Sequence, residues 1–421
     1  MDFQPYLDAL HQEIKPALGC TEPIAVALAV ARAREALGCL PEGITLAVSR
    51  NILKNAMGVG IPGTGMVGLE IAAALSALAG HSSYGLEVLS AATPADREAA
   101  KAYAAKGIIH VSAENTDKKL YIRAQVYAGE HVATCIIEDA HTQITHVQLD
   151  DQILEHTDLR TAHPGAAAAH ALSIAGIYDF ICAVDLSQLT FLQKAIAMND
   201  AVAQEGLRHD YGMHVGRTLC EGRTPEDMSL SEYVCAYTSA AADARMAGCT
   251  LPVMSTAGSG NQGISASLPV AAAARKLGLG EEKLLRAEAL SQLVTIHIKS
   301  YIGKLSPLCG CAIASSIGSA CGVVYLLGGG IEQIRCAIQN MIADISGLIC
   351  DGAKSGCALK IASSVASAMQ CAQLAMAGVS ATSLDGIIAT DEESSIRNLG
   401  NLGKEGMENT DRVILDMMIA K

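Results

Sequence analysis

The sequence predicts an α+β protein in two parts, an α+β domain over residues 1–165 and an all-α domain over residues 166–421. Short runs of alternating apolar and polar residues, typical of strands, occur only in the first part. Long apolar runs with helical spacing, separated by glycine-containing turns, fill the second part. The length of 421 residues also exceeds what one hydrophobic core normally fills.

The first part mixes both kinds of element. An amphipathic helix is predicted over 4–15, and a second helix from about 22 to 37 with Thr21 as its N-cap. A third helix ends near Ala79. Gly129 marks a hairpin turn between two of the predicted strands. The predicted strands are 44–49, 85–89, 108–113, 120–128, 131–138 and 143–149.

The second part is predicted to contain helices alone, followed by a polar, turn-rich tail from 391 to 406. Half of all residues are hydrophobic, but there is no Trp and there are only three Phe. The core must therefore consist of Ala, Val, Ile, Leu and Met, whose small side chains let helices pack closely. The predicted helices are 187–205, 229–247, 262–277, 281–302, 311–327, 330–348 and 356–377.

Charge and composition exclude several classes of protein. The formal net charge is −13 and no run rich in Lys or Arg occurs, which argues against binding of nucleic acid. The N-terminus is acidic and amphipathic and lacks the features of a signal peptide, so we expect a cytoplasmic protein. Its 14 cysteines should then be mostly reduced, and many should be small core residues.

Two uncharged stretches, 309–330 and 362–383, are long enough in principle to span a bilayer. Both are rich in Gly, Ser and Ala and lack an aromatic belt or basic flanks. They fit buried helices better, so no membrane association is expected.

Four cysteines lie in or beside turns at the ends of predicted helices, where side chains can converge. They are Cys309, Cys311, Cys350 and Cys357. Thiolates are the usual ligands of iron–sulfur clusters, and three of them would leave one iron open as a Lewis acid. Buried core cysteines or a zinc site are the alternatives, because the spacing differs from the tight runs of ferredoxins.

A fifth cysteine, Cys20, directly precedes a predicted helix. The partial positive charge of a helix N-terminus lowers the pKa of a thiol, which makes Cys20 a candidate base or nucleophile. A core cysteine next to a helix cap is the alternative.

A polar loop over 255–263 opens another predicted helix and suits a carboxylate or phosphate. Its candidate ligand-binding residues are Ser259, Asn261 and Gln262.

Four polar residues further upstream are candidate substrate contacts, with a solvated loop as the ordinary alternative. They are Asn51, Lys54, Asn55 and Thr64. The glycines at 63, 65 and 68 match a dinucleotide fingerprint by letter, but the βαβ succession it requires is missing. Asp243 and Arg245, near the end of an apolar helix, predict an ion pair.

Taken together, these motifs resemble the L-cysteine desulfidase family, which is related to the α-domain of iron–sulfur L-serine dehydratases. The resemblance extends over essentially the whole chain. It rests on Gly19-Cys20-Thr21-Glu22-Pro23, Asn51 with Ile61-Pro62-Gly63-Thr64, Ser259-Gly260-Asn261-Gln262-Gly263, Cys309-Gly310-Cys311 and Cys350-Asp351-Gly352-Ala353-Lys354.

The resemblance implies a [4Fe–4S] cluster, no pyridoxal phosphate, and cleavage of L-cysteine to pyruvate, ammonia and hydrogen sulfide. Cys350 and Cys357 match the ligand segment of the dehydratases, although they stand closer together here. A third ligand comes from Cys309 or Cys311, and Cys311 is preferred because the dehydratases present a single Gly-Cys there. Cys20, in a part specific to the desulfidases, becomes the candidate base.

Three other interpretations stay open. The same scaffold could dehydrate L-serine, since the leaving groups differ by one atom. A non-enzymatic iron–sulfur redox sensor belongs to a different class of protein. A pyridoxal enzyme would need a Schiff-base lysine, for which Lys299 and Lys354 are the candidates. The expected partner is a small amino-acid substrate, without nucleic acid or membrane, and a homo-oligomer is left open.

Overall fold

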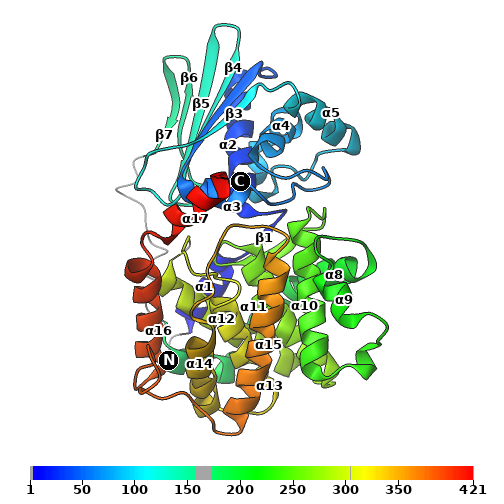
Figure 1. Cartoon of the computed structure of the whole chain (residues 1–421), viewed down its shortest axis with the longest axis vertical. Helices are drawn as coiled ribbons and strands as arrows, with labels where there is room; N and C mark the ends of the chain where they lie inside the picture. The colour runs from blue at the N-terminus through cyan, green and yellow to red at the C-terminus, as the bar shows by residue number, and fades with distance from the viewer. Residues whose placement is uncertain (1–2, 158–171, 304, 421) are drawn as a thin grey trace.

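A computed structural model describes residues 3–157, 172–303 and 305–420, arranged as two parts stacked along the long axis (Figure 1). A mixed sheet with its helices forms one part, and helices form nearly all of the other. The predicted combination of an N-terminal sheet region and a helical C-terminal region agrees with this arrangement. The predicted boundary at 165/166 lies outside the described residues.

Six strands form the sheet in the order β3-β2-β4-β5-β6-β7, and only the β2/β3 pair is parallel. Gly129, with φ of +58°, lies in the predicted hairpin turn between β4 and β5. Burial alternates along β4 and β5, so one face of the sheet is packed and the other is more open. The strands are β2 (Gly43–Val48), β3 (Ile109–Ala113), β4 (Tyr121–Ala128), β5 (His131–Glu138), β6 (Ile144–Leu149) and β7 (Gln152–His156).

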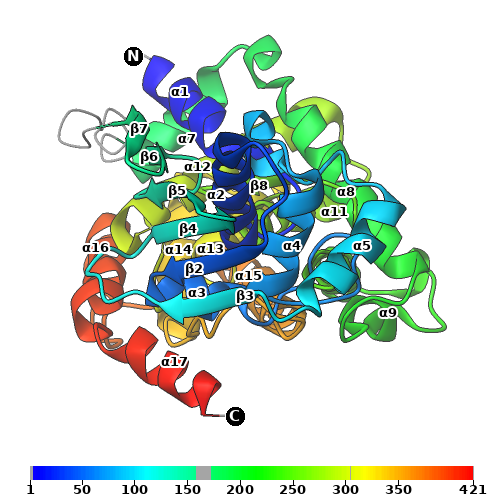
Figure 2. The same ribbon diagram turned by 90° about the horizontal axis from the view of Figure 1, so that it is seen from above.

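Two helices, α2 (Thr21–Leu37) and α4 (Leu69–Ala79), lie on the packed face of the sheet, and α5 (Pro94–Ala104) packs against α4 (Figure 2). Sequence periodicity did not indicate α5. The predicted strand over 85–89 is wrong, because the chain there forms a short 3₁₀ helix, Ser82–Glu87, followed by a turn. Gly85, with φ of +55° and ψ of −122°, adopts a backbone conformation that does not continue a strand.

Helices α11, α12 and α13 form the centre of the helical part. They pack closely at glycines, since a Cβ at Gly318 would lie 2.4 Å from the carbonyl oxygen of Ser291. The helices are α7 (Ile174–Ala183), α8 (Leu192–Arg208), α9 (Val215–Cys220), α10 (Leu230–Met246), α11 (Gly260–Lys276), α12 (Glu281–Ile302), α13 (Ala314–Leu326), α14 (Ile331–Ile345) and α15 (Cys357–Met376).

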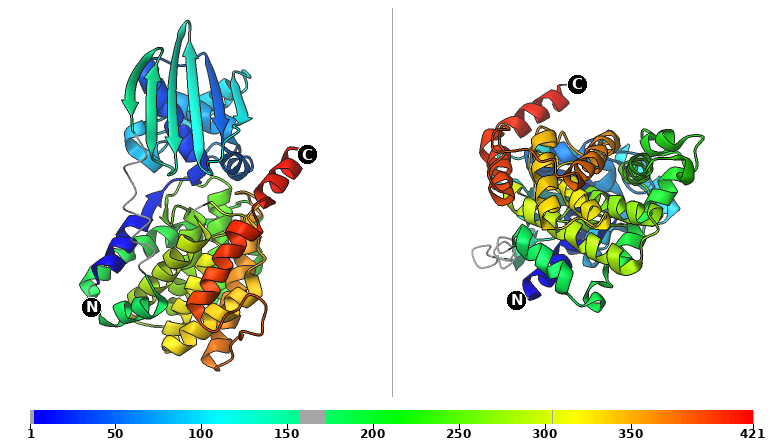
Figure 3. Two further views of the ribbon diagram at one scale, coloured as in Figure 1. Left: turned by 90° about the vertical axis from the view of Figure 1, so that its left-hand side faces the viewer. Right: turned by 90° about the horizontal axis from the view of Figure 1, so that it is seen from below.

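Both ends of the chain connect the two parts (Figure 3). At the N-terminus, α1 (Gln4–Glu13) packs into the core of the helical part, and β1 (Ile14–Ala17) then pairs antiparallel with β8 (Val253–Thr256). The first helix thus ends two residues before its predicted end. The prediction that no strand follows residue 165 is also wrong, since β8 is a strand.

The tail over 391–406, predicted as turn-rich, contains the helix α16 (Glu392–Asn401), and α17 (Thr410–Ile419) follows it. The last of these contacts α3 (Arg50–Ala56) of the N-terminal part.

Among the described residues, no single helix is both long and apolar enough to cross a membrane. Only the bent pair of Ile174–Ala183 with Leu186–Arg208 meets the requirements of length and composition jointly.

Candidate functional site

Two cysteine-bearing loops of the helical part are joined by backbone hydrogen bonds. Leu308 and Ile349 form an isolated antiparallel bridge. Beside it, the N–H of Cys309 donates to the carbonyl of Leu348 at 2.9 Å, and the N–H of Cys350 donates to the carbonyl of Pro307 at 2.6 Å. This pairing holds the loops on either side of one space, although they are about forty residues apart in the sequence.

Cys309, Cys311, Cys350 and Cys357 all line one cavity of about 90 Å³ at the junction of the two parts. Cys357 begins α15, and the sulfurs of Cys309 and Cys311 lie 3.5 Å apart. Because of this short separation, either of these two sulfurs can serve as a ligand at the same point of the cavity wall. The structure therefore brings together all four cysteines that the sequence singled out.

Four thiols on one cavity wall have the donor chemistry of an iron–sulfur cluster. Within the described ranges, no group of three or more His, Cys, Asp or Glu side chains is arranged to hold one ion. A structural zinc site gathers four ligands around one point, whereas these thiols are distributed along a cavity wall. In a [4Fe–4S] cluster each thiolate binds its own iron, so the ligands are spread over a larger body.

Two lysines, Lys354 and Lys360, lie beside the cysteine loops and bind Asp351. Burial acts to raise the pKa of Asp351, but hydrogen bonds and charges from Lys354 and Lys360 lower it to about 2. A hydrogen bond from the Cys311 thiol lowers the pKa of Cys309, and the charges of the same two lysines add to this effect.

The other three thiols differ from Cys309. Burial raises the pKa of Cys350, and it raises the pKa of Cys357 to about 12, while the hydrogen bond with Cys309 raises the pKa of Cys311. Of the four, Cys309 is therefore the thiol whose surroundings favour the thiolate.

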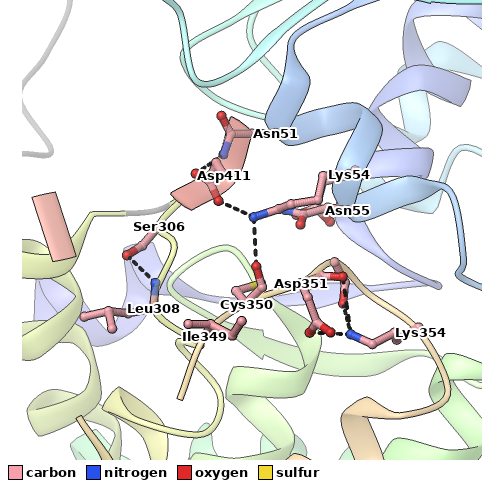
Figure 4. Close-up of polar contacts among 12 residues, drawn as sticks. Asn51, Lys54, Asn55, Ser306, Leu308, Ile349, Cys350, Asp351, Lys354 and Asp411 are labelled. Atoms are coloured by element: carbon pink, nitrogen blue, oxygen red, sulfur yellow. Dashed lines mark hydrogen bonds and ion pairs between the residues drawn. The ribbon is translucent and has the colours of Figure 1, made fainter. Parts of the chain in front are cut away.

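Lys54 and the C-terminal helix hold the cysteine loop from the other side (Figure 4). The Lys54 side chain is 1 % exposed, and its Nζ donates to the carbonyl of Cys350 at 3.0 Å and to Asp411 of α17 at 2.5 Å. Asn51 donates to the other carboxylate oxygen of Asp411 at 2.7 Å. Gly352 packs so closely here that a Cβ would lie 2.3 Å from the Lys54 carbonyl.

The predicted substrate contacts divide into two groups. Asn55, Ser259, Asn261 and Gln262 line the cavity. Asn51, Lys54 and Thr64 are not among its lining residues. The first two bind Asp411, and the Thr64 hydroxyl donates to the carbonyl of Ile61 at 2.9 Å within a turn. These three residues therefore have structural partners, and we leave them out of the site proposed below.

Cys20 also lines the cavity, and it is the N-cap residue of α2 in place of Thr21. The expected lowering of its pKa by the helix N-terminus is wrong for this environment. Burial raises the pKa of Cys20 to about 11, against the opposing charge and hydrogen bond of Arg245. The side chain is 2 % exposed, which explains why desolvation outweighs the helix end.

Among the charged residues of the cavity wall, Glu22, Arg245 and Lys360 were not predicted as site residues, whereas Lys299 was a candidate Schiff-base lysine. The intrahelical or interhelical ion pair expected of Asp243 and Arg245 is not formed among the described residues. Asp243 accepts the N–H groups of Met213 and Gly216, whereas Arg245 turns the other way, toward the cavity. The signal in the sequence that could have indicated a site role for Arg245 was an arginine within a helix of mostly small residues.

Comparison with known proteins assigns the chain to a family. Residues 83–416 match the family model described as serine dehydratase alpha chain, a range that includes the four cavity cysteines but not Cys20. The chain is 45% identical over 418 residues to a UPF0597 protein of Clostridium perfringens, covering 99% of this chain and 98% of that protein. It is 46% identical over 416 residues to a UPF0597 protein of Bacteroides fragilis, covering 98% and 97%. The chain belongs to the serine dehydratase alpha chain family.

Proposed function

We propose that the chain is an iron–sulfur-dependent carbon–sulfur lyase that eliminates sulfide from L-cysteine, leaving pyruvate and ammonia. The observation that carries this proposal is the cavity in which Cys20 meets the four clustered cysteines. Cys350, Cys357 and one of the two sulfurs 3.5 Å apart would hold a [4Fe–4S] cluster, with Cys311 preferred over Cys309.

When bound, such a cluster supplies a Lewis-acidic iron with an open position. In the proposed reaction, Cys20 must first lose the proton that burial favours on its thiol, and the charge and hydrogen bond of Arg245 favour this loss. The resulting thiolate then removes the α-proton of the substrate. The electron pair of the Cα–H bond forms the Cα–Cβ double bond, and the Cβ–S bond breaks with its pair on sulfur, which leaves as hydrosulfide. The resulting aminoacrylate tautomerises and takes up water, giving pyruvate and ammonia. Ser259, Asn261 and Gln262 position the substrate on the cavity wall.

Anaerobic purification followed by assay of sulfide and pyruvate release from L-cysteine tests the reaction. The Cys20→Ala variant should keep the brown colour of the cluster and lose turnover. Cys135→Ala, which removes a fully buried thiol in β5 away from the cavity, should keep both. Wild-type turnover in Cys20→Ala would rule out Cys20 as the base.

A second candidate substrate is L-serine, which the match to the serine dehydratase alpha chain favours. Dehydration would follow the same proton removal, with hydroxide in place of hydrosulfide as the leaving group. Direct competition between L-cysteine and L-serine under anaerobic conditions gives the ratio of the two kcat/KM values. A cluster-containing protein that releases pyruvate from neither amino acid would instead be an iron–sulfur protein without lyase activity.

A further inference from the structure

Arg245 is a buried cation without a carboxylate partner. Its side chain is 5 % exposed, and its two terminal nitrogens donate to neutral groups, the Asn261 side-chain oxygen at 2.9 Å and the Gly19 carbonyl at 2.8 Å. Among the described residues no carboxylate forms an ion pair with it, although its guanidinium is within hydrogen-bonding reach of the Cys20 thiol, and its Nε has no hydrogen-bond partner there. A guanidinium stays charged at any relevant pH, so burial without a counter-ion is costly. A bound anion at this position on the cavity wall would therefore be stabilised by the Arg245 charge.

The N-terminus of α11 adds to the same positive region. Ser259 is the N-cap residue of this helix of 17 residues, and its side chain makes no capping hydrogen bond. Backbone N–H groups at such an end attract carboxylates. Gly260 lets the guanidinium reach this helix end, since a Cβ there would lie 2.3 Å from the Arg245 Nε. The Arg245 side chain and the N-terminus of α11 thus form one anion-binding region.

A separate anionic region lies by α2 and α3. The Glu22 carboxylate accepts hydrogen bonds from the Asn55 amide and from the Thr21 hydroxyl, both at 3.0 Å. Within the parts of the chain that the structure describes, no lysine, arginine or histidine forms an ion pair with it. Asn55 is 7 % exposed, and its side-chain oxygen, also on the cavity wall, has no partner. A carboxylate beside a free amide oxygen suits an ammonium group, which has three donors.

Cys20 lies in the neighbourhood of both regions. It stands two residues before Glu22 at the start of α2, and the Arg245 guanidinium is within hydrogen-bonding reach of its thiol. The carboxylate and ammonium of an α-amino acid are bonded to the same carbon. A ligand held by both regions would therefore present its α-carbon between them, beside Cys20, and would leave its β-substituent free to face the four clustered cysteines.

We propose that Arg245 and the N-terminus of α11 bind the α-carboxylate of the substrate, and that Glu22 and Asn55 bind its α-ammonium. The site thereby selects free zwitterionic α-amino acids and excludes plain thiols, amines and carboxylates. This assignment rests on the proposed lyase function, and it names the two anchors that orient the substrate for it.

Substrate analogues test the assignment on the unmodified holoenzyme. Cysteamine lacks the carboxylate and 3-mercaptopropionate lacks the amine, so each loses one anchor. A hydrogen-bonded charge contributes enough that each analogue should inhibit L-cysteine turnover with a constant about 10- to 100-fold above the KM of L-cysteine. Inhibition by either analogue at concentrations near that KM would overturn the assignment.

Glu22→Gln and Arg245→Lys test the anchors one at a time. Each should raise the KM for L-cysteine by about 10- to 100-fold while the iron and sulfide content stays at the wild-type value. The matched control is Glu70→Gln, an exposed glutamate at the second residue of α4, as Glu22 is of α2. It should leave KM unchanged. If Arg245→Lys fails to fold, Glu22→Gln and the analogue series still decide the outcome.

Calorimetry with L-alanine separates failure of this assignment from failure of the lyase function. L-alanine carries both charged groups but no leaving group, so its binding does not depend on turnover. It should bind at least about 10-fold more tightly than propionate or ethylamine, and Glu22→Gln should remove this preference. This pattern without any L-cysteine turnover would refute the lyase function and support the anchors. Turnover with unchanged KM in both variants would overturn the anchors alone.

Discussion

Substitution of Asp411 by Asn should destabilise the protein through Lys54, the buried lysine that joins the C-terminal helix to the carbonyl of Cys350. The Lys54 side chain is 1 % exposed, so its ammonium cannot be rehydrated when its partner is neutralised. Removal of one partner of a buried ion pair costs about 3–5 kcal/mol. Since Asp411 is 16 % exposed, we expect the lower end, about 3 kcal/mol, for Asp411→Asn.

The complementary variant Lys54→Met should cost less, about 2 kcal/mol, because Asp411 can turn to solvent once the ammonium is gone. The double variant should be less destabilised than the sum of the two single variants, since both act on one pair. Urea denaturation followed by far-UV circular dichroism measures all three changes.

A surface pair provides the control. Lys101 and Glu98 lie 2.7 Å apart on α5 with exposed side-chain fractions of 37% and 72%. Lys101→Met should therefore change the unfolding free energy by about 0.5 kcal/mol or less. If Asp411→Asn is no more destabilising than Lys101→Met, the contact of Lys54 with Asp411 contributes no stability, and the C-terminal helix does not support the cysteine loop.

Two further predictions concern other buried positions. Gly352→Ala should destabilise the protein and reduce its iron content, because Gly352 has φ of +90° and the added Cβ would lie 2.3 Å from the Lys54 carbonyl, as urea denaturation and iron analysis would show. Burial raises the pKa of Glu288 to about 7, so the folded protein keeps a proton that the unfolded chain releases near pH 4.5. The contribution of this group to the unfolding free energy is then complete below pH 4.5 and is lost as the pH rises to about 7. At pH 8, Glu288→Gln should therefore have an unfolding free energy up to about 3 kcal/mol above that of the wild type, as urea denaturation would measure.

Local periodicity was sufficient to predict most strands and helices. The hairpin at Gly129 and its two flanking strands follow from alternation and a turn residue within about twenty positions. The β1/β8 pair could not be predicted in this way, because Lys15 pairs with Ser255, and each strand has only four residues. Such short segments carry no periodic signal of their own, and their pairing depends on the tertiary fold.

For the candidate site, the cysteines were predictable and their surroundings were not. Turns at helix ends indicated where thiols could converge, and Cys309 and Cys350 do line one cavity. Lys54 resembled a substrate contact because its partner, Asp411, lies 357 positions later in the chain. Arg245 was expected to take part in an intrahelical or interhelical ion pair, because charged residues near the end of an apolar helix usually do. Helix geometry instead turns Asp243 and Arg245 to different surroundings.

The iron and acid-labile sulfide content of the anaerobically purified protein tests the cluster site most directly. We expect about four of each per chain, with a brown colour that oxygen bleaches, as a [4Fe–4S] cluster requires. Cys350→Ser and Cys357→Ser should lose most of this iron, whereas Cys321→Ser, at a fully buried thiol on α13, should retain it. Protein that takes up no iron and sulfide on anaerobic reconstitution, or that keeps its full content in Cys350→Ser, would contradict the proposed cluster site.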